Sequence, residues 1–316
     1  MINISYADNN AEQHYLALSD QLQARLRNII KSRKVTINKV KYSVDNVLLV
    51  YLKNLQTEAN LKELITARPE KFRSIIKKLR TRIPNILDST SDANRVLYNL
   101  FIKSSYDHES FKKLEFIERI GMDTCAYCNR TYTFSLEKKN KIKPEIDHFM
   151  PKSKYPFLGV SYYNLIPSCQ VCNGLDTKNQ NDPRAFGVRN PYEIKHSDFI
   201  FRYELKTGNV LNTLTDPESI TLSFSKKING NLKMFKLQEL YDKHRDHVVE
   251  LIILSKSKYV ENYRKYLRQY KKKGLKFSDN EIDRMIMGNY VSEKELHKRP
   301  LAKLYHDIGK QLGLIV

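Results

Sequence analysis

The chain has 316 residues, of which 41% are hydrophobic, so it can bury a core and its composition excludes a disordered protein. This length is typical of two or three domains. The formal net charge of +20 indicates a polyanionic partner, either nucleic acid or an anionic membrane surface. No apolar run approaches the ~18 residues of a membrane span and "MINISYADNN" lacks the pattern of a signal peptide, so we expect a cytoplasmic protein without membrane attachment.

Apolar residues recur at helical spacing through most of residues 1–118. The segment "AEQHYLALSDQLQARLRNIIKS" shows this spacing, and it returns in "EKFRSIIKKLRTRI" and "ANRVLYNLFIKS". We therefore predict an N-terminal helical region over residues 1–118. Its cations are spread over the polar faces, which is more typical of a solvated surface than of a specific binding stripe.

Residues 119–195 contain all the cysteines and most of the loop-forming residues, and we predict that they form a central domain. Beyond them, "FIFRYEL" and "SITLSFS" alternate apolar and polar residues between turns at "TGN" and "NGN", which predicts a small β-hairpin. From about Lys236 the helical period returns. Residues 196–316 are thus predicted to be a hairpin followed by a helical region, and the fold class is a mainly helical α+β protein.

The four cysteines fall into two C-x-x-C pairs, Cys125 with Cys128 and Cys169 with Cys172. Nothing marks the chain as secreted, which disfavours disulfides. Two such pairs in an intracellular chain predict a tetrahedral zinc site. A redox C-x-x-C is the alternative, but the second matching pair argues against it. Because four thiolates leave no open coordination position, this zinc is predicted to be structural.

The segment between the two pairs has the pattern of two strands and a helix. "KIKPEIDHF" can form a strand, a loop with Pro151 follows, and "YYNLIP" can form the return strand. Ser168 is then expected to cap the helix that carries Cys169 and Cys172. The result is a ββα unit with zinc at the base of its helix.

Polar residues stand at three places in this unit. Asp147 and His148 lie in the first strand, Asn164 lies at the second, and Asn173 follows the last cysteine. Histidine suits proton transfer near neutral pH, and the oxygens of Asp and Asn suit Mg²⁺ or Mn²⁺. Neighbours in a regular strand point to opposite faces, so Asp147 and His148 can address one phosphate only if the strand bulges or ends there.

The order of these residues resembles the HNH, or His-Me finger, nuclease motif in its four-cysteine zinc form. Within that family, the segments "CAYCNRTY", "IDHFMPKSKYP" and "NLIPSCQVCN" are most similar to the HNH nuclease subunits of the Septu and retron-type anti-phage systems of bacteria. The resemblance covers about residues 120–180. It implies a zinc-stapled ββα-metal endonuclease that hydrolyses DNA, with a partner ATPase in a defence complex.

The resemblance also implies a role for each of these residues. His148 is expected to be the general base, and Asp147 and Asn173 are expected to bind a catalytic Mg²⁺ or Mn²⁺. Asn164 is expected to brace the loop behind His148 and orient its ring.

Three lysines are candidates for contact with the nucleic-acid backbone. Lys152 and Lys154 lie in the loop directly after His148, next to the presumed chemistry. The family commonly has a lysine three residues after the helix asparagine. Here Lys178 lies five residues after Asn173, and we retain it as a candidate phosphate contact.

Several alternatives remain open. A zinc-stapled nucleic-acid-binding or scaffold subunit would have the same cysteines without catalysis, and an HNH nuclease can also act on RNA. His244 and His247 have the spacing of a second metal site, although buried or solvated histidines are more common. The segment "YRKYLRQYKKKGLK" either follows a phosphate backbone or is an amphipathic helix.

Overall fold

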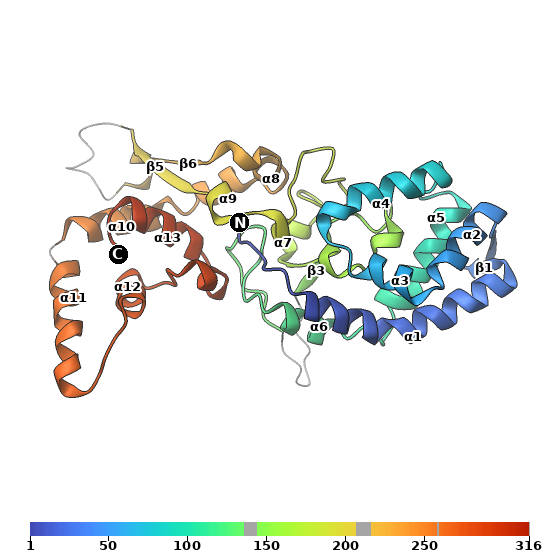
Figure 1. Cartoon of the computed structure of the whole chain (residues 1–316). Helices are drawn as coiled ribbons and strands as arrows, with labels where there is room; N and C mark the ends of the chain where they lie inside the picture. The colour runs from blue at the N-terminus through green and yellow to red at the C-terminus, as the bar shows by residue number, and fades with distance from the viewer. Residues whose placement is uncertain (136–143, 207–215, 258, 316) are drawn as a thin grey trace. The chain divides into compact units, whose positions relative to one another are not determined.

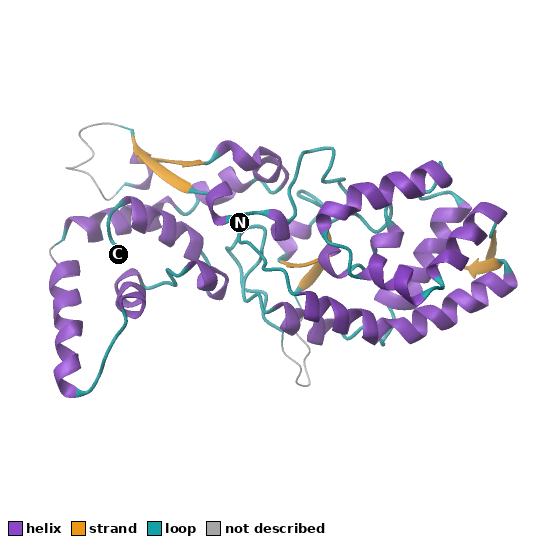
Figure 2. Ribbon diagram, viewed as in Figure 1, coloured by secondary structure: helices purple, strands orange, loops and turns teal. Residues whose placement is uncertain are grey.

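The computed structural model describes residues 1–135, 144–206, 216–257 and 259–315 (Figure 1). These residues form mostly helices, with three two-stranded antiparallel sheets (Figure 2), so the mainly helical α+β prediction is confirmed at that level. Within the described ranges, no helix is both long and apolar enough to cross a membrane. The chain divides into an N-terminal unit of residues 5–121 and 135–183 and a C-terminal unit of residues 1–4, 122–134 and 184–316.

The N-terminal unit is built around the long helix α1 (Asp8–Ser32). Leu18, Leu22 and Leu26 of α1 are buried and lie one turn apart, so they form an apolar face. Helix α1 packs against α2, α3 and the π-helix η1. The helices that follow in this unit are α2 (Asn46–Leu55), α3 (Glu58–Ile65), α4 (Pro69–Arg82), α5 (Asp92–Tyr98), η1 (Asn99–Tyr106), α6 (Lys113–Ile120) and α7 (Gln170–Asn173).

A β-hairpin that was not predicted interrupts the N-terminal helical region. Strands β1 (Lys34–Ile37) and β2 (Val40–Ser43) pair antiparallel across Asn38 and Lys39. Both turn residues have positive φ, 48° and 67°, which a tight two-residue hairpin turn requires. Apolar and polar residues alternate in both strands, so the local period of two prevails over the helical context.

Helix α5 continues directly into the π-helix η1. The amide of Asp107 donates to the carbonyl of Ile102 over 2.8 Å, and the hydroxyl of Ser105 donates to the carbonyl of Leu100 over 2.8 Å. The first is a backbone bond over five residues, which is the wider π-helical spacing, and the second is a side-chain bond across the same turn. The segment ends at Tyr106, a buried ring at the candidate site described below.

Two strands and a helix form where the ββα unit was predicted, but Tyr162–Asn164 of the expected return strand form a 3-10 helix, so that strand begins only at Leu165. Strand β3 (Glu145–His148) pairs antiparallel with β4 (Leu165–Ser168), and α7 follows at once. The N-cap prediction was wrong by one residue, because Ser168 ends β4 and Cys169 takes the N-cap position of α7. The antiparallel register places the end of β4, and with it the start of α7, beside Glu145 at the start of β3, whereas His148 at the end of β3 lies beside Leu165.

The C-terminal unit contains the predicted second hairpin, formed by β5 (Phe201–Leu205) and β6 (Ile220–Phe224). Phe199, Phe201 and Tyr241 are buried at its base and form its aromatic core. The helices of this unit are α8 (Asn229–Met234), α9 (Leu237–Asp242), α10 (Arg245–Lys256), α11 (Tyr259–Gln269), α12 (Asp279–Met287) and α13 (Ala302–Gln311).

Helix α8 occupies the segment where we expected a turn at "NGN". The predicted turn at residues 207–209 lies outside the described residues, as do residues 141–143 of the first predicted strand. Tyr263 of α11 packs against a cluster of Leu267, Ile282 and Ile286, which favours the amphipathic interpretation of this basic helix.

Candidate metal centre and catalytic pocket

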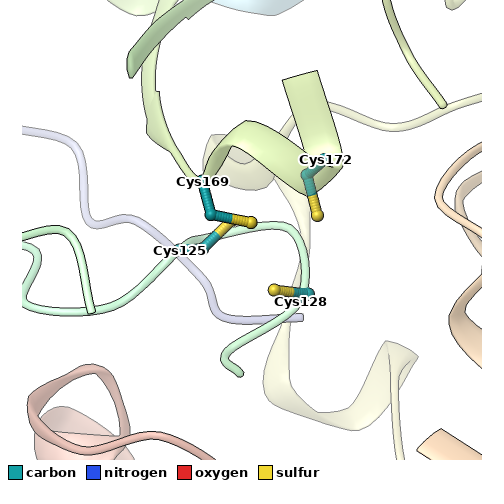
Figure 3. Close-up of side chains that lie close together, drawn as sticks. All are labelled: Cys125, Cys128, Cys169 and Cys172. Carbon is teal, nitrogen blue, oxygen red and sulfur yellow. The ribbon is translucent and has the colours of Figure 1, made fainter. Parts of the chain in front are cut away.

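Four buried cysteine side chains point toward one another (Figure 3). The sulfur atoms of Cys125, Cys128, Cys169 and Cys172 all lie within 4.8 Å of one another. Two thiolates on one tetrahedral Zn²⁺ lie about 3.8 Å apart, because zinc–sulfur bonds are about 2.3 Å long. The type, number and burial of these donors therefore fit a structural zinc ion.

The first cysteine pair lies in a tight turn. The amide of Asn129 donates to the carbonyl of Cys125 over 2.7 Å, and Asn129 has a positive φ of 53°. This geometry directs the amide of Arg130 at the sulfur of Cys128, 3.4 Å away. An N–H donor stabilises the thiolate form that a metal requires.

Asn129 also fixes this turn within the C-terminal unit, which the sequence analysis did not anticipate. Its side-chain amide donates to the carbonyl of Leu296 over 3.1 Å, and its side-chain oxygen accepts from the amide of Lys303 over 3.0 Å. Its own carbonyl accepts from the amide of Leu301. Only its position directly after Cys128 could have indicated this role.

Asp147 and His148 line the same pocket, which has a volume of about 240 Å³. Asp147 and His148 are the last two residues of β3, so the strand's alternation of side chains between its two faces stops at His148. Asn173 at the end of α7 lines the same pocket. The full lining consists of Tyr98, Ile146, Asp147, His148, Pro151, Lys152, Ser153, Asn173, Asn179 and Gln180. The structure thus brings the predicted base and both predicted metal ligands together.

The backbone fixes the tautomer of His148. Its Nε2 lies 3.0 Å from the carbonyl oxygen of Gly159, and a carbonyl only accepts, so Nε2 carries the hydrogen and Nδ1 keeps a lone pair. Burial lowers the pKa of His148 well below its usual value, and the charges of Lys152 and Lys178 lower it further. His148 is therefore neutral at neutral pH, with Nδ1 as its basic nitrogen.

Asn164 makes the contacts expected of a brace. Its side-chain oxygen accepts from the amide of Met150 over 2.7 Å. Its side-chain amide donates to the carbonyl of Leu158 over 2.9 Å and to that of Met150 over 3.3 Å. Asn164 is fully buried and ties both ends of the loop between β3 and β4, including the segment next to Gly159.

Glu145 orients Asn173, a contact that the sequence analysis did not predict. The side-chain amide of Asn173 donates to a carboxylate oxygen of Glu145 over 2.8 Å. Because the nitrogen must face this carboxylate, the amide oxygen faces away from it. The carbonyl oxygen is the ligand atom that Asn173 would offer to Mg²⁺ or Mn²⁺. Glu145 stands two residues before Asp147 and therefore lies on the same side of β3. This spacing was the signal in the sequence that could have placed Glu145 at the site.

The three candidate lysines lie in different environments. Lys152 lines the pocket, and its ammonium lies 5.3 Å from the ring centre of Tyr106. Lys154 forms an ion pair with Asp182 at 2.9 Å. Lys178 is fully buried, and its ammonium donates to Asp147 over 2.8 Å. This placement of Lys178 differs from the surface phosphate contact that we expected.

Residues far from the motif in sequence complete the surroundings of His148. The ring of Tyr106 lies edge-on to the ring of His148, with 4.4 Å between centroids. The ammonium of Lys113 lies 4.2 Å from the ring centre of Tyr106 and also lowers the pKa of His148. Tyr98 lines the pocket. All three come from the N-terminal helical region, where no sequence pattern linked them to the motif.

A second group of possible metal ligands contains His244, Asp246 and His247, with ligand atoms within 4.8 Å of one another. Nε2 of His244 accepts a hydrogen bond from the guanidinium of Arg130 over 2.9 Å. That bond uses the single lone pair of a neutral imidazole. Nδ1 of His247 is bonded to the hydroxyl of Tyr305 at 2.8 Å. These partners account for both histidines without a metal ion.

Part of the chain is distantly similar to a known protein. Septu protein PtuB of Bacillus thuringiensis is 36% identical to this chain over 96 residues. The match covers 30% of this chain and 34% of that protein, so the chain spans about a third of the length of the curated relative that it matches. No family model and no solved structure matches the chain. The similarity agrees with the Septu resemblance of the sequence motif.

Proposed function

We propose that this protein is a metal-dependent HNH endonuclease that hydrolyses DNA. The observation that carries the proposal is the pocket that holds His148, Asp147 and Asn173 together, with His148 neutral and its Nε2 engaged by Gly159. A proton acceptor beside two oxygen ligands is the equipment that metal-assisted hydrolysis of a phosphodiester requires.

Each side chain has a defined task in this proposal. Nδ1 of His148 accepts the proton of the attacking water. Asp147 and the amide oxygen of Asn173 hold Mg²⁺ or Mn²⁺, which supplies charge stabilisation for the phosphate and the leaving oxygen. Glu145 keeps the amide of Asn173 turned toward the pocket, and Asn164 keeps the loop behind His148 in place.

Lys152 is the strongest candidate for contact with the scissile phosphate. It lines the same pocket as His148, and its ammonium lies 5.3 Å from the ring centre of Tyr106, which packs against His148. A bound phosphate would offset the charge of Lys152 and so raise the proton affinity of His148 toward that of a useful base. Lys154, which is paired with Asp182, is the second candidate.

We further propose an anti-phage defence role, supported by the distant similarity to the Septu protein PtuB. In this proposal the protein acts in the cytoplasm with a partner ATPase that restrains its nuclease. The net charge of +20 supports a nucleic-acid substrate. A nucleic-acid-binding or scaffold subunit without catalysis is the alternative from a different functional class, and cleavage of RNA is the alternative within the same class.

A cleavage assay with purified protein tests the proposal. Supercoiled plasmid and a labelled RNA are incubated with Mg²⁺ or with EDTA, using wild type, His148→Ala and His108→Ala. His108 is an exposed histidine of the same unit and serves as the matched control. We expect wild type and the control to cut DNA only with Mg²⁺, and His148→Ala to lose at least about a hundredfold of the rate.

The other outcomes separate the alternatives. Undiminished cutting by His148→Ala would sink the nuclease assignment. Preferential cutting of RNA would show that the substrate is RNA and not DNA. Salt-sensitive DNA binding without cutting, in the presence and absence of the partner, would favour the binding subunit.

A further inference from the structure

The ammonium of Lys178 is buried at the centre of the candidate site. It donates to Oδ1 of Asp147 over 2.8 Å and to the backbone carbonyl of His148 over 2.7 Å. The side chain of Lys178 is 0% exposed and that of Asp147 is 3% exposed. A buried ion pair of this kind interacts much more strongly than a surface pair, because water screens it little.

The loop after α7 holds Lys178 in this position. The hydroxyl of Thr177 has one hydrogen, which it shares between the carbonyl oxygens of Val171 and Cys172, 2.6 Å and 2.9 Å away. The side chain of Asn181 donates to the carbonyl of Thr177 over 3.0 Å. Lys178 is therefore fixed by its own loop against β3.

The two bonds of Lys178 have different consequences. The bond to His148 fixes the backbone carbonyl of the last residue of β3. The side chains of Asp147 and His148 line one pocket at this end of the strand. The bond to Asp147 places one positive charge on the carboxylate that is the proposed metal ligand. A divalent cation at Asp147 would have to bind beside that charge, which weakens its binding.

We propose that Lys178 is a positioning residue that keeps the affinity of the free protein for the catalytic metal low. It orients Asp147 and neutralises it, so tight binding of Mg²⁺ or Mn²⁺ requires additional phosphate oxygens from the substrate. The site thereby loads its metal when nucleic acid is present. This inference rests on the proposed function, because it concerns the same metal ligands.

Titration with Mn²⁺ alone, without nucleic acid, tests the inference on zinc-loaded protein by calorimetry and by thermal unfolding. The variants are Lys178→Met, which removes the charge, and Lys178→Arg, which keeps it. Lys303→Met is the matched control, because Lys303 forms a buried pair with Asp307 at 2.6 Å and its side chain is 2% exposed. We expect Lys178→Met to bind Mn²⁺ at least about tenfold more tightly than wild type, and the other two to bind like wild type.

If the role of Lys178 were purely structural, Lys178→Met would behave like Lys303→Met, with a lower melting temperature and an unchanged affinity for Mn²⁺. Unchanged or weaker Mn²⁺ binding by Lys178→Met therefore overturns the inference. If Lys178→Met does not fold, Lys178→Gln takes its place with the same expectation, because it also lacks the charge. Mn²⁺ binding as expected without DNA cleavage would contradict the proposed function alone, whereas cleavage with unchanged affinity would contradict this inference alone.

Discussion

Nε2 of His148 lies 3.0 Å from the carbonyl oxygen of Gly159, eleven residues further along the chain. The proposed base is therefore held by the backbone of the loop that connects β3 to β4, and the conformation of this loop decides which ring nitrogen is free.

The glycine at position 159 is required by close packing. A Cβ there would lie 2.2 Å from Cδ1 of Ile102 and 2.9 Å from the carbonyl oxygen of Pro156. Gly159→Ala must therefore shift the carbonyl that orients His148, and we expect at least about a tenfold loss in the cleavage rate. The zinc content should be unchanged. Adding Ile102→Ala should recover part of the rate, and full activity of the single variant would contradict the role of this carbonyl.

The brace formed by Asn164 can be separated from general stability. Asn164→Asp removes the N–H donors to Leu158 and Met150 and should cost about 1–3 kcal/mol of unfolding free energy, with loss of cleavage. Asn94→Asp is the control, because Asn94 is buried and donates to the carbonyl of Ile86 over 2.9 Å. We expect a similar destabilisation from it, measured by urea unfolding, but normal cleavage below its melting temperature. Equal losses of activity in both variants would count against a specific brace.

Removal of one cysteine should release the zinc ion. We expect reduced, purified wild type to contain about one Zn²⁺ per chain by metal analysis, and Cys172→Ser to contain little and to melt at a lower temperature. Ser168→Ala changes a neighbouring residue that is not a candidate ligand, and it should retain the metal. Because the chain has four cysteines and all belong to this cluster, zinc-free wild type would overturn the assignment directly.

Stability should depend on pH through His14. Burial lowers its pKa to about 4, while its bond to the carbonyl of Val160 opposes this shift. As the pH falls below 6.5, His14 of the unfolded chain takes up a proton, whereas His14 of the folded chain stays neutral until about pH 4. The contribution of His14 to the unfolding free energy is therefore fully present above pH 6.5 and decreases as the pH falls toward 4. The loss amounts to roughly 3 kcal/mol. His14→Gln should flatten this slope between pH 7 and pH 4.5 in urea unfolding; an unchanged slope would contradict the assignment.

The sequence was most informative where chemistry and local pattern coincide. The two C-x-x-C pairs, the strands around Asp147 and Asn164, and the short helix before Asn173 could all be located from residue type and spacing. The β1–β2 hairpin was missed because its alternating pattern is short and lies between strong helical patterns. The turn at Asn38 and Lys39, which both have positive φ, makes this segment a hairpin and not a helix.

The remaining features of the site depend on long-range packing. Tyr106 packs against His148 and Lys113 lies over the ring of Tyr106, and both come from helices without a motif, whose pattern alone predicted a solvated or buried helical face. The position of Lys178 could not be predicted either, because a lysine fits a phosphate contact as well as it fits a buried ion pair. Its burial against Asp147 follows from the path of the loop after α7, which spacing does not encode.

The π-helix η1 determines the direction in which Tyr106 points. Each residue of an α-helix turns the chain by about 100°, so deleting one residue from the π-helical turn would restore α-helical spacing and rotate everything beyond it by roughly that angle. Tyr106 would then leave the ring of His148, although His148 and the other candidate site residues would be unchanged. A length change in the N-terminal region can therefore alter the surroundings of the proposed base as effectively as a substitution within the motif.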